Sequence, residues 1–319
     1  MTDLTERLSQ LSDTKRLALR RLLADKNAQA RLLESEGSSI KLLRPGDPHG
    51  PTLFIFPATE GSVGYMSGYL PHIPTGWSVY GCQTPGLDGE QEPAMTVERI
   101  AAQAIPWIRE IQPHGPYVLA GNCMGGLPAF ETARQLEAAG GTVASLIHLM
   151  PTFAREWEQM PTGDALLSRA LIDYGFIIER LLGRTVDLPL QQITEAPEEQ
   201  RIDILVDFLS ELPELGGVSR AEFYRRIAVY RANLGAMFAY RPAGGVQTAF
   251  NVIAVGASDR GEQVVDPASP YAAALRATAP GHVLISQVDA EASTLFDCAE
   301  PHMSAVGAVL HNLLSDVRA

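Results

Sequence analysis

The residues best suited to chemistry lie in a short glycine-rich segment, Gly121-Asn122-Cys123-Met124-Gly125. An apolar run that predicts a strand, Tyr117–Ala120, ends just before it, and a helical pattern, Leu127–Ala139, begins just after it. In this G-x-C-x-G pattern the central residue occupies a strained strand-to-helix turn, which flanking glycines permit because they carry no Cβ. Its side chain then stands at a helix N-terminus, which favours a thiolate. We therefore interpret Cys123 as a nucleophile; the alternative is a structural cysteine buried in a tight turn.

A thiolate that attacks a carbonyl group needs hydrogen-bond donors for the oxyanion that develops. The backbone N–H of Met124, one residue after the nucleophile, is the expected first donor. We expect the second from the loop that follows the predicted strand Thr52–Phe56, at Ala58 or Thr59. These residues predict acyl chemistry at the end of two neighbouring strands.

The elements that must position these residues alternate along the chain, which predicts a mostly parallel α/β sheet covered by helices on both faces. Residues 152–247 contain helical patterns at 165–182, 198–212 and 220–240 and predict a helical insertion. The predicted strands are Ile40–Leu43, Thr52–Phe56, Trp77–Cys82, Tyr117–Ala120, Val143–Leu149, Ala249–Val255 and His282–Val288, and the predicted sheet-covering helices are Thr96–Ile111, Leu127–Ala139 and Ser304–Leu314.

The first residues form a compositional zone of their own. Leu4, Leu8 and Leu11 share one helical face, and a second amphipathic helix follows. We therefore predict an N-terminal helical extension at 1–38 and one large domain at 39–319. The extension either packs on the domain as a solvated helix or docks a partner protein.

Composition narrows the partners and the compartment. A net charge of −12 makes nucleic acid and anionic membranes poor partners. Only three cysteines occur, without a C-x-x-C pair, which argues against a disulfide framework and against structural zinc. The N-terminus shows no signal-peptide pattern, and no apolar run reaches the length of a membrane span. We expect a cytoplasmic enzyme without a metal or cofactor of its own.

Several segments in chain order resemble the thioesterase domains of nonribosomal peptide and polyketide synthetases. They are Gly121–Gly125, which forms the nucleophile elbow (called the elbow below), and Leu53–Pro57, Thr84–Gly89, Gln112–Tyr117, Phe130–Leu136 and Tyr230–Leu234. The resemblance covers roughly residues 40–315 and implies an α/β-hydrolase fold in which the helical insertion, at about 152–247, is a lid over the acyl chain. It also implies a substrate bound as a thioester to the 4′-phosphopantetheine arm of an acyl or peptidyl carrier protein.

The chain departs from this family at each catalytic position. The nucleophile is Cys123 rather than serine, the place of the usual acid holds Met150, and the place of the usual histidine holds Ala292. Asp259 follows a later strand, where many other α/β-hydrolases carry their acid, and is either that acid or a surface-loop residue. His302 is either the general base or a residue that begins the last helix. His148, inside a strand, is expected to be a core histidine.

Three functions fit these residues. The first is an acyltransferase that takes an acyl or aminoacyl group onto Cys123 and passes it to a second acceptor, as the resemblance to cysteine-dependent aminoacyl-shuttling members implies. The second is a chain-releasing thioesterase or cyclase with Cys123, His302 and Asp259 as a rearranged triad. The third is a degenerate module that only binds carrier proteins; an intact elbow argues against it.

Overall fold

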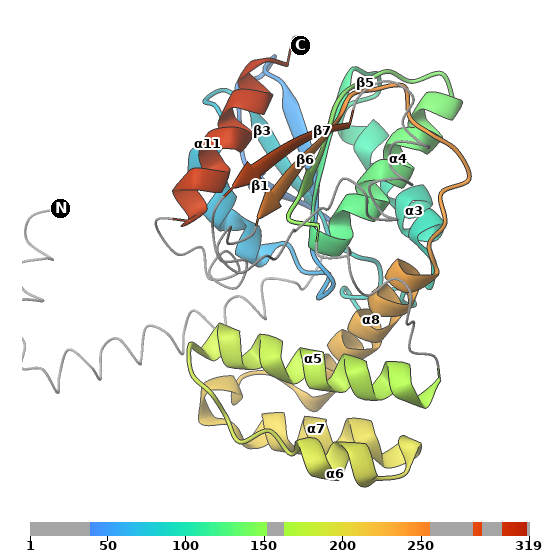
Figure 1. Cartoon of the computed structure of the whole chain (residues 1–319), viewed down its shortest axis with the longest axis vertical. Helices are drawn as coiled ribbons and strands as arrows, with labels where there is room; N and C mark the ends of the chain where they lie inside the picture. Colours follow the sequence, from blue (N-terminus) through green and yellow to red (C-terminus); the bar gives the residue numbers. More distant parts are fainter. Residues whose placement is uncertain (1–38, 152–162, 256–282, 289–301, 318–319) are drawn as a thin grey trace, which may run out of the picture.

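A seven-stranded sheet organises the residues that the computed structural model describes, which are 39–151, 163–255, 283–288 and 302–317. The strand order is β1-β3-β2-β4-β5-β6-β7 (Figure 1). β1 pairs with β3 in an antiparallel ladder, and all other neighbours are parallel, which confirms the mostly parallel sheet. The strands are β1 (Ile40–Arg44), β2 (Thr52–Phe56), β3 (Ser78–Cys82), β4 (Tyr117–Asn122), β5 (Val143–Leu149), β6 (Phe250–Val255) and β7 (Val283–Val288). The predicted extension at 1–38 lies outside the described residues.

Both faces of the sheet are covered by helices. Successive side chains of a strand point to opposite faces, and β2 divides accordingly: Phe54 and Phe56 join one apolar core, and Leu53 and Ile55 join the other. The first core includes α3 (Val97–Ile111) and α4 (Gly126–Ala138). The second includes η1 (Gly64–His72) and α11 (His302–Ser315), which lies on the opposite side of the sheet in Figure 1.

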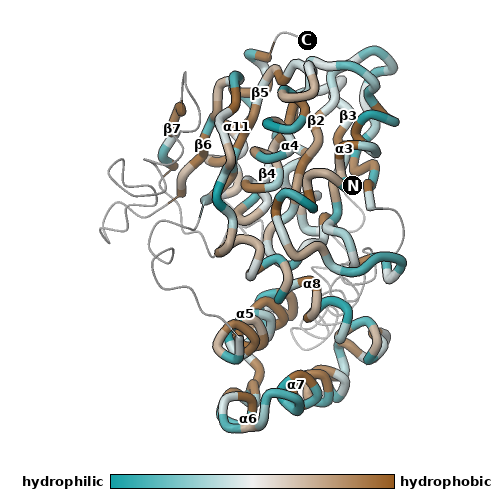
Figure 2. The backbone as a smooth tube through the Cα atoms, turned by 90° about the vertical axis from the view of Figure 1, so that its right-hand side faces the viewer, coloured by the Kyte–Doolittle hydropathy of each residue, from teal (hydrophilic) through white to brown (hydrophobic). Residues whose placement is uncertain are grey.

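Helices also fill the long segment between β5 and β6, as the sequence predicts. The lid helices are α5 (Asp164–Leu182), α6 (Leu190–Glu195), α7 (Glu198–Glu211) and α8 (Arg220–Ala239), with a short turn, η3 (Pro213–Leu215). They group at one end of the sheet, with the apolar positions of α5 and α7 facing into the group (Figures 1 and 2). The described helices are all too short or too polar to cross a membrane.

Side-chain N-caps define where α3 and α8 begin. Thr96 Oγ1 accepts a hydrogen bond from the Arg99 N–H (3.2 Å) at the start of α3. Ser219 Oγ accepts one from the Glu222 N–H (3.1 Å) at the start of α8. Each such N-cap stabilises a helix by about 1 kcal/mol. The cap at Ser219 fixes the start of α8, which carries several side chains to the site described below.

Candidate active site

The backbone at Cys123 has the strained geometry that the glycine pattern predicts. Cys123 lies between β4 and the single turn η2 (Cys123–Gly125), with a left-handed φ of 52° that costs a non-glycine residue about 1–2 kcal/mol. A Cβ on Gly121 would lie 2.1 Å from the Gly125 carbonyl oxygen, and a Cβ on Gly125 would lie 2.3 Å from that of Pro57. Both glycines are therefore required by close backbone approach, and the second approach seats the elbow against the end of β2.

The two cysteines among the described residues differ in their surroundings. The Cys82 side chain is 2% exposed, and burial raises the pKa of its thiol, which keeps it protonated and unreactive. Cys123 is 8% exposed and interacts electrostatically with Tyr230 of the lid helix α8. Cys298 lies outside the described residues. Cys123 is thus the described cysteine that lies where the sheet meets the lid.

Of the three predicted oxyanion donors, the geometry favours two. Met124 is in the first turn of η2, whose N–H groups have no acceptor inside the helix, and no side chain caps that turn. Ala58 already donates its N–H to Tyr65 Oη (2.9 Å). Within the described part of the chain, the N–H of Thr59 makes no hydrogen bond, so Thr59 is the better second donor.

Two side chains tie the Thr59 loop to its surroundings, and the sequence gave no reason to select either. Tyr65 Oη accepts hydrogen bonds from Ala58 N–H and from Asn122 Nδ2 (2.9 Å each), which links the loop to the residue before Cys123. From α8, Asn233 Nδ2 donates to the Thr59 carbonyl oxygen (2.8 Å). Asn233 belongs to one of the segments that resemble the thioesterase domains, which was the available signal for it.

His148 is the core histidine that the sequence predicts, and its hydrogen-bond partner is the backbone of Cys123. The β4–β5 register places Gly121 beside His148, whose ring is fully buried with Nε2 2.6 Å from the Cys123 carbonyl oxygen. Because a carbonyl oxygen only accepts, Nε2 carries the proton. Burial lowers the pKa of His148 to about 4, and the hydrogen bond to Cys123 opposes that shift only in part. A Cβ on Gly126 would lie 2.1 Å from the ring, so that glycine makes room for it.

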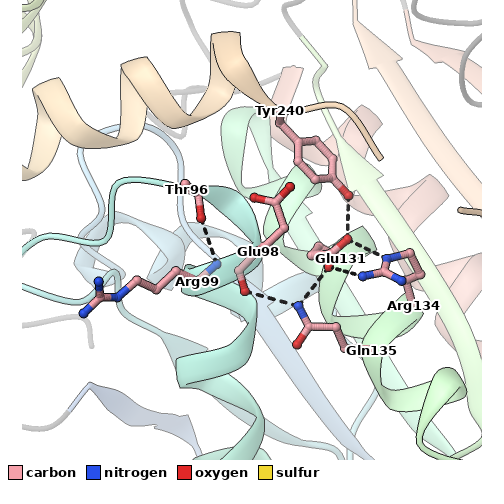
Figure 3. A network of polar contacts seen from close by, with 7 residues as sticks. All are labelled: Thr96, Glu98, Arg99, Glu131, Arg134, Gln135 and Tyr240. Carbon is pink, nitrogen blue, oxygen red and sulfur yellow. Dashed lines mark hydrogen bonds and ion pairs between the residues drawn. The ribbon is translucent and has the colours of Figure 1, made fainter. Parts of the chain in front are cut away.

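A polar network holds the helix that follows the elbow. Glu131 of α4 accepts hydrogen bonds from Arg134 Nε (2.8 Å), Gln135 Nε2 (2.8 Å) and Tyr240 Oη (2.8 Å), as Figure 3 shows. Gln135 also donates to the Glu98 carbonyl oxygen of α3 (3.2 Å). Burial alone would raise the pKa of Glu131, but these hydrogen bonds outweigh it and lower the pKa. The carboxylate therefore joins α4 to Tyr240 at the end of α8, and Gln135 joins α4 to α3.

The described residues place neither the predicted acid, Asp259, nor the side chain of the predicted base, His302, beside Cys123. Asp259 and Ala292 lie outside the described residues. His302 begins α11, and its side chain is also outside them. Met150 follows β5 with a φ of 51°, is 3% exposed, and lies in the apolar core that contains Met303 of α11. A thioether in this place supplies neither an acid nor a base.

Glu60 is a titratable residue that the sequence reasoning missed. It directly follows Thr59, and burial raises the pKa of its carboxyl to about 7, with its own N–H and Arg226 opposing the shift. An isolated acidic residue in a loop carries no pattern that would have selected it. In the described residues, no group of three or more His, Cys, Asp or Glu side chains is arranged to hold a metal ion.

Comparison with known proteins gives the same assignment for the sequence and for the fold. Residues 51–195 match the family model of the thioesterase domain. The non-reducing polyketide synthase crz7 of Cladonia metacorallifera is 38% identical over 132 residues, which are 41% of this chain and 6% of that synthase. A probable non-canonical nonribosomal peptide synthetase, CymA of Salinispora arenicola (strain CNS-205), is 28% identical over 225 residues, which are 70% of this chain and 3% of CymA.

Among solved structures, the NocB thioesterase domain, in covalent complex with a fluorophosphonate nocardicin G analog, superposes with a TM-score of 0.55. It shares 20% identity with this chain, and the match covers 86% of this chain and 99% of that domain. The chain thus spans a small part of the synthases but nearly the whole length of an isolated domain. Residues 51–195 are thus similar to the thioesterase domain, and the chain has the α/β-hydrolase fold.

Proposed function

We propose that this domain is an acyltransferase of nonribosomal peptide or polyketide biosynthesis that carries its acyl or aminoacyl group on Cys123. The observation that carries this proposal is the left-handed turn at Cys123, 8% exposed, followed by the Met124 N–H in a turn that no side chain caps. The substrate arrives as a thioester on the phosphopantetheine arm of a carrier protein. Residues 1–38 are proposed to dock a partner chain.

The reaction is an exchange between two thioesters. The Cys123 thiolate attacks the carbonyl carbon, and the Met124 and Thr59 N–H groups stabilise the oxyanion. The C–S bond to the carrier then breaks, the carrier thiolate leaves and takes a proton from water, and the acyl group remains on Cys123. The second acceptor reverses these steps. Because a thiol exists partly as thiolate near neutral pH, this exchange needs little help from a base.

Hydrolysis is more demanding, because a general base must activate water. His148 is unsuited to that role, since it is fully buried and already donates Nε2–H to the Cys123 carbonyl oxygen. Met150 cannot act as an acid or base either. These features support an enzyme that passes its acyl group to another acceptor faster than to water.

The alternative is a chain-releasing thioesterase or cyclase, which the match to the thioesterase family model supports equally. In it His302 and Asp259 would complete a triad with Cys123. A module that only binds carrier proteins is the third reading, and it leaves the strain at Cys123 without a purpose.

A partition experiment separates these functions. The protein is mixed with an acyl-loaded carrier and an unloaded second carrier, and the acyl group is followed by intact mass. Transfer that exceeds release of free acid, and that Cys123→Ala abolishes, supports the proposal. Rapid release of free acid that His302→Ala abolishes supports the chain-releasing enzyme. If the protein binds the carrier but catalyses neither transfer nor release, the result supports a module that only binds carrier proteins.

A further inference from the structure

Glu60 lies on the loop that also supplies the proposed oxyanion donor. Gly61 N–H donates to the Ala58 carbonyl oxygen (2.9 Å), which closes a tight turn with Thr59 and Glu60 at its centre. A Cβ on Gly61 would lie 3.1 Å from the Cγ1 atom of Val229, so the turn packs against α8. Because Asn233 also holds the Thr59 carbonyl oxygen, Glu60 is fixed at the junction between this loop and the lid.

Tyrosines from η1 and from two lid helices interact with this carboxyl group. Glu60 interacts electrostatically with Tyr65, with Tyr174 of α5 and with Tyr230 of α8. The rings of Tyr174 and Tyr230 meet edge to face with centroids 5.9 Å apart. Tyr230 also interacts electrostatically with Cys123, so Tyr230 is common to the surroundings of Glu60 and of Cys123.

Two polar groups of this cluster, the Glu60 carboxyl and the Tyr174 hydroxyl, have no side-chain hydrogen-bond partner among the described residues. The hydrogen bond to the Glu60 carboxyl group comes from its own backbone N–H, and the described residues form no ion pair with it. Arg226 lowers the pKa of Glu60, but its Nε is held by Glu222 (2.6 Å). Tyr174 is 3% exposed, and its hydroxyl has no hydrogen-bond partner among the described residues.

We propose that Glu60, with Tyr174 and Tyr230, binds a protonated amine on the acyl group that Cys123 carries. A carboxylate beside aromatic rings is the combination that attracts an ammonium group, through a charge-assisted hydrogen bond and through cation–π contact. The Tyr174 hydroxyl supplies a further acceptor. This inference rests on the proposed function and narrows its substrate to acyl groups with a basic amine near the carbonyl carbon.

A different role for Glu60 would be to balance the charge of Arg226. Arg225 and Arg226 both pair with Glu222, and the positive charge of Arg226 also acts on Glu60. In that role the carboxylate would stabilise the fold and would treat charged and neutral acyl groups alike. The two roles therefore differ in what a matched pair of acyl groups should show.

The test compares alanyl-pantetheine with 2-methylpropanoyl-pantetheine, in which a methyl group replaces the ammonium. The rate at which each thioester acylates Cys123 is followed by intact mass. The wild type should prefer the alanyl group, and Glu60→Gln should reduce that preference by about ten- to a hundredfold. Glu92→Gln, at an exposed position outside the cluster, should leave it unchanged.

As a control, the thermal unfolding midpoint of each variant is measured to check that the variant is folded. Tyr174→Phe keeps the ring and removes the hydroxyl, so it should reduce the preference without abolishing acylation. Equal rates for both thioesters in the wild type, or an equal loss for both in Glu60→Gln, would overturn the inference while leaving acyl transfer intact. Failure of the wild type to accept either thioester, or an acyl-loaded carrier, would overturn the proposed function together with this inference.

Discussion

At the residue scale, Cys123 is held by its backbone more than by its side chain. Gly121 and Gly125 permit the turn, and His148 donates Nε2–H to the carbonyl oxygen of Cys123 itself. A hydrogen bond at that oxygen fixes the peptide plane from which the thiol projects. The described residues therefore explain how the Cys123 side chain is oriented. Its expected reactivity comes from the thiol group itself.

Replacing the thiol by a hydroxyl tests that view. In Cys123→Ser the nucleophile is a weak acid that needs a base, and a general base is worth about 10²–10⁴-fold. We expect acyl transfer to fall by about 100-fold or more, measured as acylated protein formed from an acyl-loaded carrier. A serine variant that turned over well would require a base close to residue 123, with Asp259 and His302 the first residues to examine.

The pH dependence of stability tests the state of His148. An unfolded histidine has a pKa near ~6.5, whereas burial lowers the pKa of His148 to about 4. Between these values the unfolded chain binds a proton that the folded chain does not, so stability is complete above pH ~6.5 and is lost as pH falls toward ~4. The loss should be on the order of 3 kcal/mol.

The His148→Leu variant lacks this titration. Its free energy of unfolding, measured by urea denaturation, should be lower than that of the wild type at pH 7, and the gap should narrow as the pH is lowered. His148→Gln serves as the control that retains a donor. A gap that stays constant from pH 7 to pH 4 would contradict the neutral buried ring.

At the element scale, α4 and α8 carry the site. α4 begins at the elbow and is joined through Gln135 to α3 and through Glu131 to Tyr240, while α8 anchors the Thr59 loop through Asn233. The first helix follows Cys123 directly in the chain, and the second contacts the Thr59 loop. Changes in the network of α4 should affect mainly stability, and changes in the anchor on α8 should affect mainly the rate of acyl transfer.

Tyr240→Phe probes the α4 network. It removes one hydrogen bond to a charged carboxylate, and such bonds contribute about 1.5–3 kcal/mol. We expect a loss of that size in the free energy of unfolding by urea, with acylation of Cys123 retained in the folded protein. Tyr80→Phe, whose half-buried ring stacks on Phe54 (centroids 5.8 Å apart), is the matched control. Equal stability of the two variants would remove Tyr240 from the network.

Asn233→Leu probes the anchor of α8. Without its hydrogen bond to the Thr59 carbonyl oxygen, the loop that carries the proposed second oxyanion donor is no longer held in place. Because small displacements of catalytic groups slow reactions strongly, the acylation rate should fall about ten- to a hundredfold. Asn312→Ala, at an exposed position of α11, should have no effect. An unchanged rate in Asn233→Leu would mean that the loop is positioned by Tyr65 alone.

At the scale of the whole molecule, the regular elements follow from hydrophobic pattern. The buried run Val143–Leu149 and the helical face of Val97, Ile100 and Ala104 were predicted from residue types and are observed as β5 and α3. The short helix α6 was not predicted, because six residues between prolines give too little periodicity to recognise. Local pattern is sufficient where an element is long and faces a core.

The site was predictable only where its geometry is local. The elbow at Cys123 is specified by its flanking glycines, so its strained φ could be expected. The choice of Thr59 over Ala58 depends on Tyr65, and the surroundings of the half-buried Glu60 depend on α5 and α8, which are more than a hundred residues away. Such contacts form only when the lid helices pack against the sheet, so no sequence pattern near Glu60 predicts them.

Peptide mapping of the acylated protein tests the central claim most directly. The protein is incubated with an acyl-loaded carrier, quenched, digested and examined by tandem mass spectrometry. The account predicts an acyl group in thioester linkage on Cys123, absent from Cys82, that persists in water and is removed when a second carrier thiol is added. Acylation elsewhere, or an acyl group on Cys123 that water removes as fast as it forms, would contradict the account.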